Sequence, residues 1–190
     1  MPVMVLSECF LFPGCLLPLF IFEERYQAML RHALATSRMF CIGVRSDADG
    51  TVLPCSTAGL VRVCATNDDG TSQLVLAGLR RIRLTGWVQE EPFPIARIEP
   101  VPTVAPDAPL AASLREEAIS RLPSPGPEDC ASIRYLRAAL LSVPDPELAC
   151  DLMAYHFVRR PEVLLRMLAE PSLLARYATL LEHLRAPAAP

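Results

Sequence analysis

The side chains that could perform chemistry in this 190-residue chain do not assemble into a recognisable site. The three histidines, His32, His156 and His183, fall in separate segments of helical periodicity, and no cysteine pair lies near a histidine at zinc-like spacing. His156 shares a face with Leu148 and Leu152, so a packed core histidine explains it better than a catalytic base. We therefore expect no catalytic residue, no metal site and no cofactor.

Charged clusters are also better explained without chemistry. Acidic pairs occur at 23–24, 90–91 and 116–117, but adjacent side chains point in different directions and rarely converge on one substrate. Arg80, Arg81 and Arg83 could bind an anion. On an alternating strand Arg81 and Arg83 share one row, which we expect to face solvent.

The composition excludes several classes of protein. All 18 basic residues are arginine, so the sequence has no lysine for a Walker A motif, a Schiff base or a Ser–Lys dyad. A net charge of −3 gives no basic footprint and argues against a nucleic-acid partner.

The cysteines and the apolar N-terminal run bear on the cellular compartment. Seven cysteines without a C-x-x-C motif indicate a reducing environment, so we expect a cytoplasmic protein without disulfides. The apolar run 9–22 lacks a positive leader, contains Pro13 and Pro18, and is too short to span a bilayer. We therefore expect the run 9–22 to lie in the hydrophobic core, and we expect no membrane partner.

Residues 1–103 alternate as short strands and turns, with one helix among them. The pattern predicts a small β-barrel or sandwich with one inserted helix. The helix is expected over 26–34, and the strands over 3–6, 9–12, 16–22, 39–45, 59–66, 72–79, 81–85 and 94–101.

Residues 104–190 have helical periodicity instead. Four prolines in 100–109 mark the boundary, and a second proline-rich break falls at 123–127. Asp145 followed by Pro146 is typical of a helix N-terminus. The chain is thus predicted to be α+β, with a β-rich domain over 1–103 and a bundle of four or five helices over 104–190.

One stretch carries a more specific signal. The run LFPGCLLPLFIFEERYQAML at 11–30 resembles the opening of the N-terminal, substrate-binding domain of Lon proteases, peptidase family S16. The F-P-G turn, the L-P-L strand and the I-F-E-x-R-Y helix start lie at 12–14, 17–19 and 21–26.

Other segments agree in the same order. GLVRV at 59–63 and LAGLRRIRL at 76–84 are similar to the family's next strands, with Leu60 where threonine is typical and Ala77 where glutamate is typical. Residues 143–157 and 173–184 are similar to its helical extension.

The resemblance implies a PUA-like β pseudobarrel followed by a helical bundle. Full-length Lon continues into an ATPase and a Ser–Lys peptidase, whereas this chain ends at Pro190 without a lysine, so it resembles a standalone Lon substrate-binding-domain protein. The implied function is non-catalytic: binding of a polypeptide substrate or a protein partner in proteolysis and quality control, alongside a separate ATPase or protease.

The site itself is only loosely indicated. A groove between the two halves or an open barrel edge is the default position, and the peptide-binding candidates are Phe20, Phe22, Trp87 and Phe93, although core packing is the role we expect first for each of them. The alternative function is a small-ligand-binding protein or a hydrolase that uses the barrel pocket. RNA binding through a PUA-like fold is disfavoured by the acidic charge.

Overall fold

The chain divides into two compact units in the computed structural model, Met1–Pro102 (the sheet unit) and Thr103–Pro190 (the helical unit). The structure describes residues 1–46, 49–122 and 131–184, with the backbone alone for 131–134. The expected break at 123–127 lies outside these residues. Helices and strands are both abundant, which confirms the α+β class.

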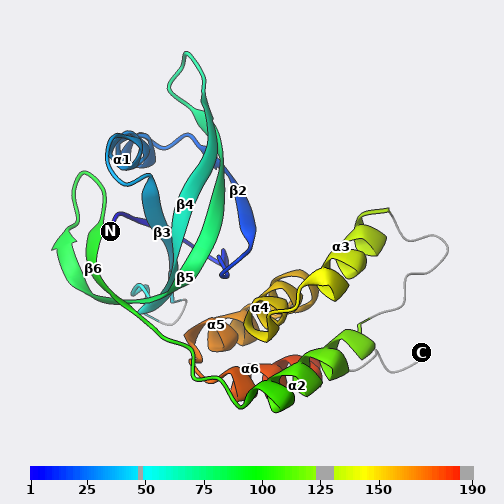
Figure 1. The fold of residues 1–190 in the computed structure, drawn as a ribbon. Helices are drawn as coiled ribbons and strands as arrows, with labels where there is room; N and C mark the ends of the chain where they lie inside the picture. The colour runs from blue at the N-terminus through cyan, green and yellow to red at the C-terminus, as the bar shows by residue number, and fades with distance from the viewer. Residues whose placement is uncertain (47–48, 123–130, 185–190) are drawn as a thin grey trace. The chain divides into compact units, whose positions relative to one another are not determined.

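The described residues of the first unit form a mixed six-stranded sheet (Figure 1). Its strand order is β1-β3-β4-β5-β2, and β6 pairs with β5; β1 and β3 are parallel and every other pair is antiparallel. The elements are β1 (Val3–Leu6), β2 (Leu16–Ile21), α1 (Glu24–Ala35), β3 (Met39–Val44), β4 (Cys55–Thr66), β5 (Ser72–Gln89) and β6 (Ile95–Pro100).

Strand β5 organises this sheet. The two strands expected at 72–79 and 81–85 are one 18-residue strand, so that prediction was wrong. The pairing of β4 with β5 shifts register between Ala58 and Gly59, so β5 continues past the position where we expected one strand to end and the next to begin. The first part of β5 pairs with β2, its last part pairs with β6, and β4 runs along its other edge.

The strand expected at 9–12 is absent. These residues form a buried loop, in which Phe12 is completely inaccessible, and the loop crosses β5 at Gly78. Gly14 N donates to Gly78 O and Gly78 N donates to Cys15 O, both at 2.9 Å. Consecutive apolar residues correctly indicated that this segment is buried, but it is buried as a closely packed loop and not as a strand.

Helix α1, predicted from its periodicity, covers the inner face of the sheet. It buries Tyr26, Met29 and Leu30 in the main core cluster, together with Leu74 and Leu76 of β5. Side chains alternate along a strand, so Val75, between Leu74 and Leu76, faces the opposite side. The helix thereby determines which face of β5 is buried within this unit.

The helical unit contains five helices within its described residues. They are α2 (Ala108–Ser120), α3 (Ala131–Ser142), α4 (Pro146–Phe157), α5 (Pro161–Ala169) and α6 (Leu173–His183). The predicted N-cap of α4 is confirmed, since Asp145 Oδ1 accepts from Glu147 N at 3.0 Å. Ser172 caps α6 in the same way through Ala175 N.

Two glycines of the sheet unit test its packing. Gly14 has φ 75°, where a side chain costs about 1–2 kcal/mol, and a Cβ on Gly78 would lie 2.1 Å from the carbonyl oxygen of Phe12. We expect Gly78→Ala to lower the free energy of unfolding more than Gly14→Ala, because backbone must move in the first case. Urea denaturation of both variants measures this, and equal losses would contradict the close approach at Gly78.

Candidate functional site

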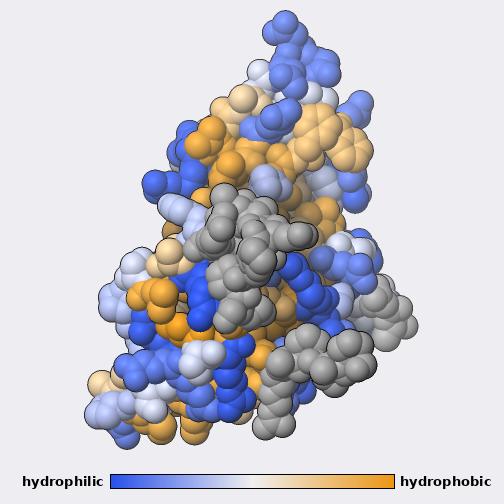
Figure 2. All heavy atoms as spheres, turned by 90° about the vertical axis from the view of Figure 1, so that its right-hand side faces the viewer, coloured by the Kyte–Doolittle hydropathy of each residue, from blue (hydrophilic) through white to orange (hydrophobic). Residues whose placement is uncertain are grey.

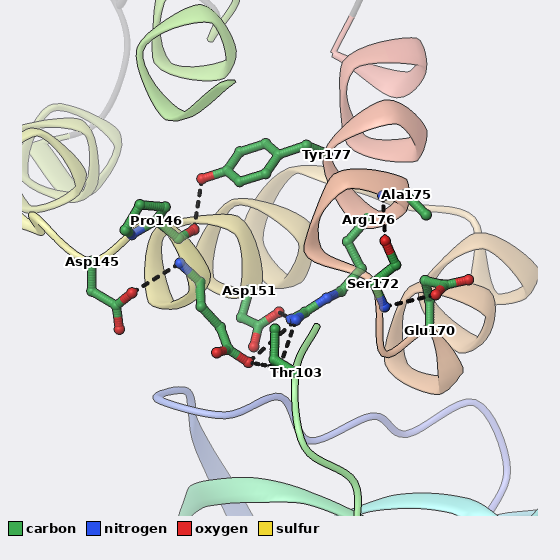
Figure 3. A network of polar contacts seen from close by, with 10 residues as sticks. Thr103, Asp145, Pro146, Asp151, Glu170, Ser172, Ala175, Arg176 and Tyr177 are labelled. Atoms are coloured by element: carbon green, nitrogen blue, oxygen red, sulfur yellow. Dashed lines mark hydrogen bonds and ion pairs between the residues drawn. The ribbon is translucent and has the colours of Figure 1, made fainter. Parts of the chain in front are cut away.

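A buried polar network is the most conspicuous cluster of charges in the helical unit (Figure 3). The side chains of Arg176 on α6 and Asp151 on α4 are both fully buried, and Nη1 of Arg176 lies 3.1 Å from Oδ1 of Asp151. Nη2 of Arg176 donates to Thr103 Oγ1 at 2.8 Å and lies 3.2 Å from Oε1 of Glu147. Thr103 also donates to Glu147.

This network is a structural one. Arg176 connects the first residue of the helical unit with α4 and α6, and its guanidinium is neutralised by carboxylates of α4. Nearby, the Tyr177 hydroxyl donates to Pro146 O at 2.6 Å, and burial raises the pKa of Tyr177. Loss of one partner of such a buried pair leaves a charge uncompensated, so the fold requires both, and a buried pair offers no exposed reactive group.

The histidines do not converge on a site. His32 packs 5.5 Å from the ring of Phe93, and Nδ1 of His183 lies 2.8 Å from Thr179 O. For His156, burial chiefly, and Arg159 to a smaller extent, lower the pKa. Within the described part of the chain, no three histidine, cysteine or acidic side chains are placed to hold a metal ion.

Three of the cysteine thiols, those of Cys9, Cys41 and Cys55, are poorly suited to nucleophilic attack. Burial raises the pKa of Cys41 to about 11, and it also raises the pKa of Cys9 and of Cys55. A thiol with a raised pKa stays protonated at neutral pH, and the thiolate is the reactive form.

The expected arginine row needs a correction. Arg81 does not face solvent beside Arg83, because it is only 3% exposed and its guanidinium lies 6.0 Å from the ring centroid of Phe12. The buried 9–12 loop covers this part of β5. Arg80 and Arg83 remain exposed.

An apolar groove lies on the face of the sheet that α1 does not cover. Three strands contribute to it in register: Pro18 and Val63 both pair with Val75, while Phe20 and Ala65 both pair with Gln73. Its volume is about 490 Å³. The lining residues are Pro18, Leu19, Phe20, Val63, Ala65, Gln73, Leu74 and Val75.

The groove presents large apolar side chains to solvent. Phe20 is 55% exposed and Val63 is 62% exposed, and Phe20 stacks on the exposed Phe22 with ring centroids 6.0 Å apart. Figure 2 shows hydrophobic surface gathered below the hydrophilic tip of the β4–β5 hairpin. Exposed apolar patches of this kind mark binding surfaces in soluble proteins.

The four aromatic candidates are not all in one place. Phe20 lines the groove and Phe22 stacks on it, whereas Trp87 lies on the last part of β5, paired with Ala96 of β6. Phe93 is 6% exposed and belongs to the main core cluster. Sequence reasoning missed Val63 and Val75. The sequence signal for Val75 was that residues 74–77 are apolar on both faces of the strand, whereas the sequence gives no such signal for Val63.

Comparison with known proteins places the chain in a family. The model of the ATP-dependent protease La (LON) substrate-binding domain matches residues 1–186. The chain belongs to the Lon substrate-binding domain family.

None of the helices in the described part of the chain has the length and the apolar character that a membrane-spanning helix needs.

Individual relatives agree with this assignment. The chain is 26% identical to the Lon protease of Desulfosudis oleivorans over 99 residues, 48% of this chain and 12% of that protein. It is 26% identical to the Lon protease of Syntrophus aciditrophicus over 110 residues, 53% of this chain and 14% of that protein. The matched region thus spans a small part of each relative.

Solved structures share the fold of this Lon domain. The N-terminal domain of Mycobacterium avium complex Lon protease superposes with a TM-score of 0.73 at 16% identity, covering 96% of each chain. The Lon N-terminal domain protein from Xanthomonas campestris gives 0.67 at 21% identity, again with 96% of each chain covered.

The structural role of the network predicts a specific pattern of stability. Arg176→Met should lower the free energy of unfolding by about 3–5 kcal/mol, because it removes the guanidinium that lies 3.1 Å from the buried Asp151 carboxylate. The double variant Arg176→Met/Asp151→Leu should lose less than the sum of the two single losses. Urea denaturation followed at 222 nm provides the measurement.

The matched control is Arg160→Met. Arg160 pairs with Glu162 at the surface, where the side chains are 66% and 59% exposed, so its loss should change stability little. If the buried and the exposed arginine were equally costly to replace, the network would not hold the helices together.

Proposed function

We propose that this Lon substrate-binding domain protein captures extended polypeptide segments by their apolar side chains, and that it does so at the apolar groove. The observation that carries the proposal is the groove itself: three strands place exposed apolar side chains in register on the face that α1 does not cover. The family's substrate-binding description supports the same function.

The size of the groove suits a short segment. The lining covers three residues along β5, from Gln73 to Val75, which is about 7 Å at about 3.4 Å per residue, so the groove contacts a few residues of an extended segment. Full burial of a side chain such as Phe20 contributes about 1.5–3 kcal/mol. Contacts of this kind depend on apolar area more than on side-chain identity, as a binder of many polypeptides requires.

Strand β2 supports an extended ligand as well. It is at one end of the strand order, and extended peptides can add to such a strand. Pro18 lies in its middle and lacks a backbone N–H, which prevents uninterrupted pairing with another strand. The edge is thereby protected from aggregation while its side chains remain accessible.

We further propose that the protein binds without catalysis, acts with a separate ATPase or protease, and has the PUA-like pseudobarrel implied by its resemblance. The sequence has no lysine for the Ser–Lys dyad of a Lon peptidase. The cytoplasmic location and the identity of a partner stay predictions.

Binding of a permanently unfolded polypeptide tests this proposal. Fluorescein-labelled, reduced and carboxymethylated α-lactalbumin serves as the probe in an anisotropy titration against the full chain. Phe20→Ala should weaken binding about tenfold, because it removes an apolar contact worth about 1.4 kcal/mol or more. Val63→Ser should weaken it in the same direction by a smaller factor.

Val88→Ser is the control for Val63→Ser. Val88 lies on β5 outside the groove and is 59% exposed, close to the 62% of Val63, so the two variants remove the same exposed methyl groups. Val88→Ser should bind the probe like the unmodified chain. Equal effects of the two valine variants, or unchanged binding by Phe20→Ala, would contradict the proposal.

A further inference from the structure

The two ends of the apolar groove differ in charge. The lining between them is uncharged, and it consists of apolar side chains with Gln73. At one end the strands terminate together, because Ile21 and Thr66 both pair with Ser72. The chain segments that leave β2 and β4 at this end carry the acidic residues.

Four carboxylates belong to this end, and we call them the acidic rim. They are Glu23, Glu24, Asp68 and Asp69. Glu23 and Glu24 follow β2 directly, while Asp68 and Asp69 lie in the turn between β4 and β5.

Contacts hold the two halves of the rim close together. A Cβ on Gly70 would lie 3.1 Å from Oε1 of Gln27, so the hairpin turn touches the first part of α1. Nε2 of Gln27 donates to Phe22 O at 3.1 Å, which connects α1 with the end of β2. Gln27 therefore brings the turn, the start of α1 and the aromatic pair of Phe20 and Phe22 to one place.

The rim keeps a negative charge after its internal pairing. Nε of Arg25 lies 3.0 Å from Oε2 of Glu23, and Arg25 is the one basic residue in the segments 20–27 and 65–73. The carboxylate of Asp69 accepts hydrogen bonds from Thr71 Oγ1 and Thr71 N. These bonds lower the pKa of Asp69, so it stays ionised at neutral pH.

The opposite end of the groove is basic. Arg62 lies beside Val63 at the bulge of β4 and is exposed. Nη2 of Arg38 donates to Val61 O at 3.3 Å at the same end. A segment in the groove therefore meets negative charge at the hairpin tip and positive charge at the other end.

We propose that the groove selects polypeptide segments in which an arginine or lysine directly flanks a run of apolar residues, with the basic side chain against the acidic rim. This inference rests on the proposed function, because it assigns a substrate class to the same groove. Apolar contacts supply most of the affinity, and the rim determines which apolar segments bind first and in which direction they lie.

Peptides with one apolar core and different flanks test the charge requirement. The probes are fluorescein-labelled Leu-Val-Phe-Val-Leu peptides flanked on one side by two lysines, two glutamates or two serines, with each flank placed at either end. At low salt the lysine peptide should bind about two- to tenfold more tightly than the glutamate peptide. The difference should shrink strongly in 0.5 M NaCl, because the rim is exposed.

Neutralisation of the rim provides the second arm. Glu24→Gln/Asp68→Asn removes two exposed charges and leaves the Asp69 carboxylate that accepts from Thr71 in place, and it should abolish the preference for lysine over glutamate. Glu90→Gln/Glu91→Gln removes two exposed charges from the loop after β5 and changes the net charge equally, so the preference should persist in this control.

The outcomes separate this inference from the proposed function. If lysine, glutamate and serine peptides bind equally and Phe20→Ala weakens all three, the groove binds apolar segments but the charge selection is wrong. A preference for the glutamate peptide, or a lysine preference lost equally in both double variants, would also overturn it. If none of the peptides binds better than one with a serine core, both proposals fail.

Discussion

The hydrogen-bonded register of β5 is the constraint on which the sheet unit depends. This strand pairs with β4 over most of its length, with β2 at its start and with β6 at its end. Because α1 covers Leu74 and Leu76 on one face, Val75 must point to the other. A one-residue slip would exchange the two faces and bury the groove residues in place of the core.

The two units differ in the contacts that hold their helices and strands together. The sheet unit relies on strand register and on close backbone packing, which is tightest where the 9–12 loop crosses Gly78. The helical unit has, beside its buried apolar side chains, a buried ion pair in which Arg176 on α6 meets Asp151 on α4, and Arg176 also bonds Thr103 at the start of the unit. The charges of the helical network are paired with one another, whereas the apolar side chains of the groove in the sheet unit remain exposed to solvent. The groove, in which three strands place exposed apolar side chains in register, is the physical reason to assign binding to the sheet unit.

Periodicity and capping chemistry predicted the local structure well where one physical effect dominates. The apolar spacing of α1 and the Asp145 cap of α4 depend on nearby residues, and both are present. The predictions of a strand at 9–12 and of two separate strands within β5 were wrong, because tertiary packing determines both features. A loop can bury Phe12 as well as a strand can.

The candidate site was harder to predict for the same reason. The aromatic residues were candidates because of their type, yet Phe93 in the loop before β6 packs in the core while Phe20 on β2 is exposed, and only the tertiary structure distinguishes the two. Val63 is an ordinary strand residue in the sequence and becomes informative only beside Val75.

Site-specific photocrosslinking tests the central claim most directly. A photoreactive p-benzoylphenylalanine in place of Phe20, or in place of the exposed Trp87 as the comparison, is irradiated in the full chain with an unfolded polypeptide present. The account predicts that the polypeptide is crosslinked from position 20 and far less from position 87. Equal crosslinking from both positions, or crosslinking from position 87 alone, would contradict the claim that the apolar groove is the binding surface.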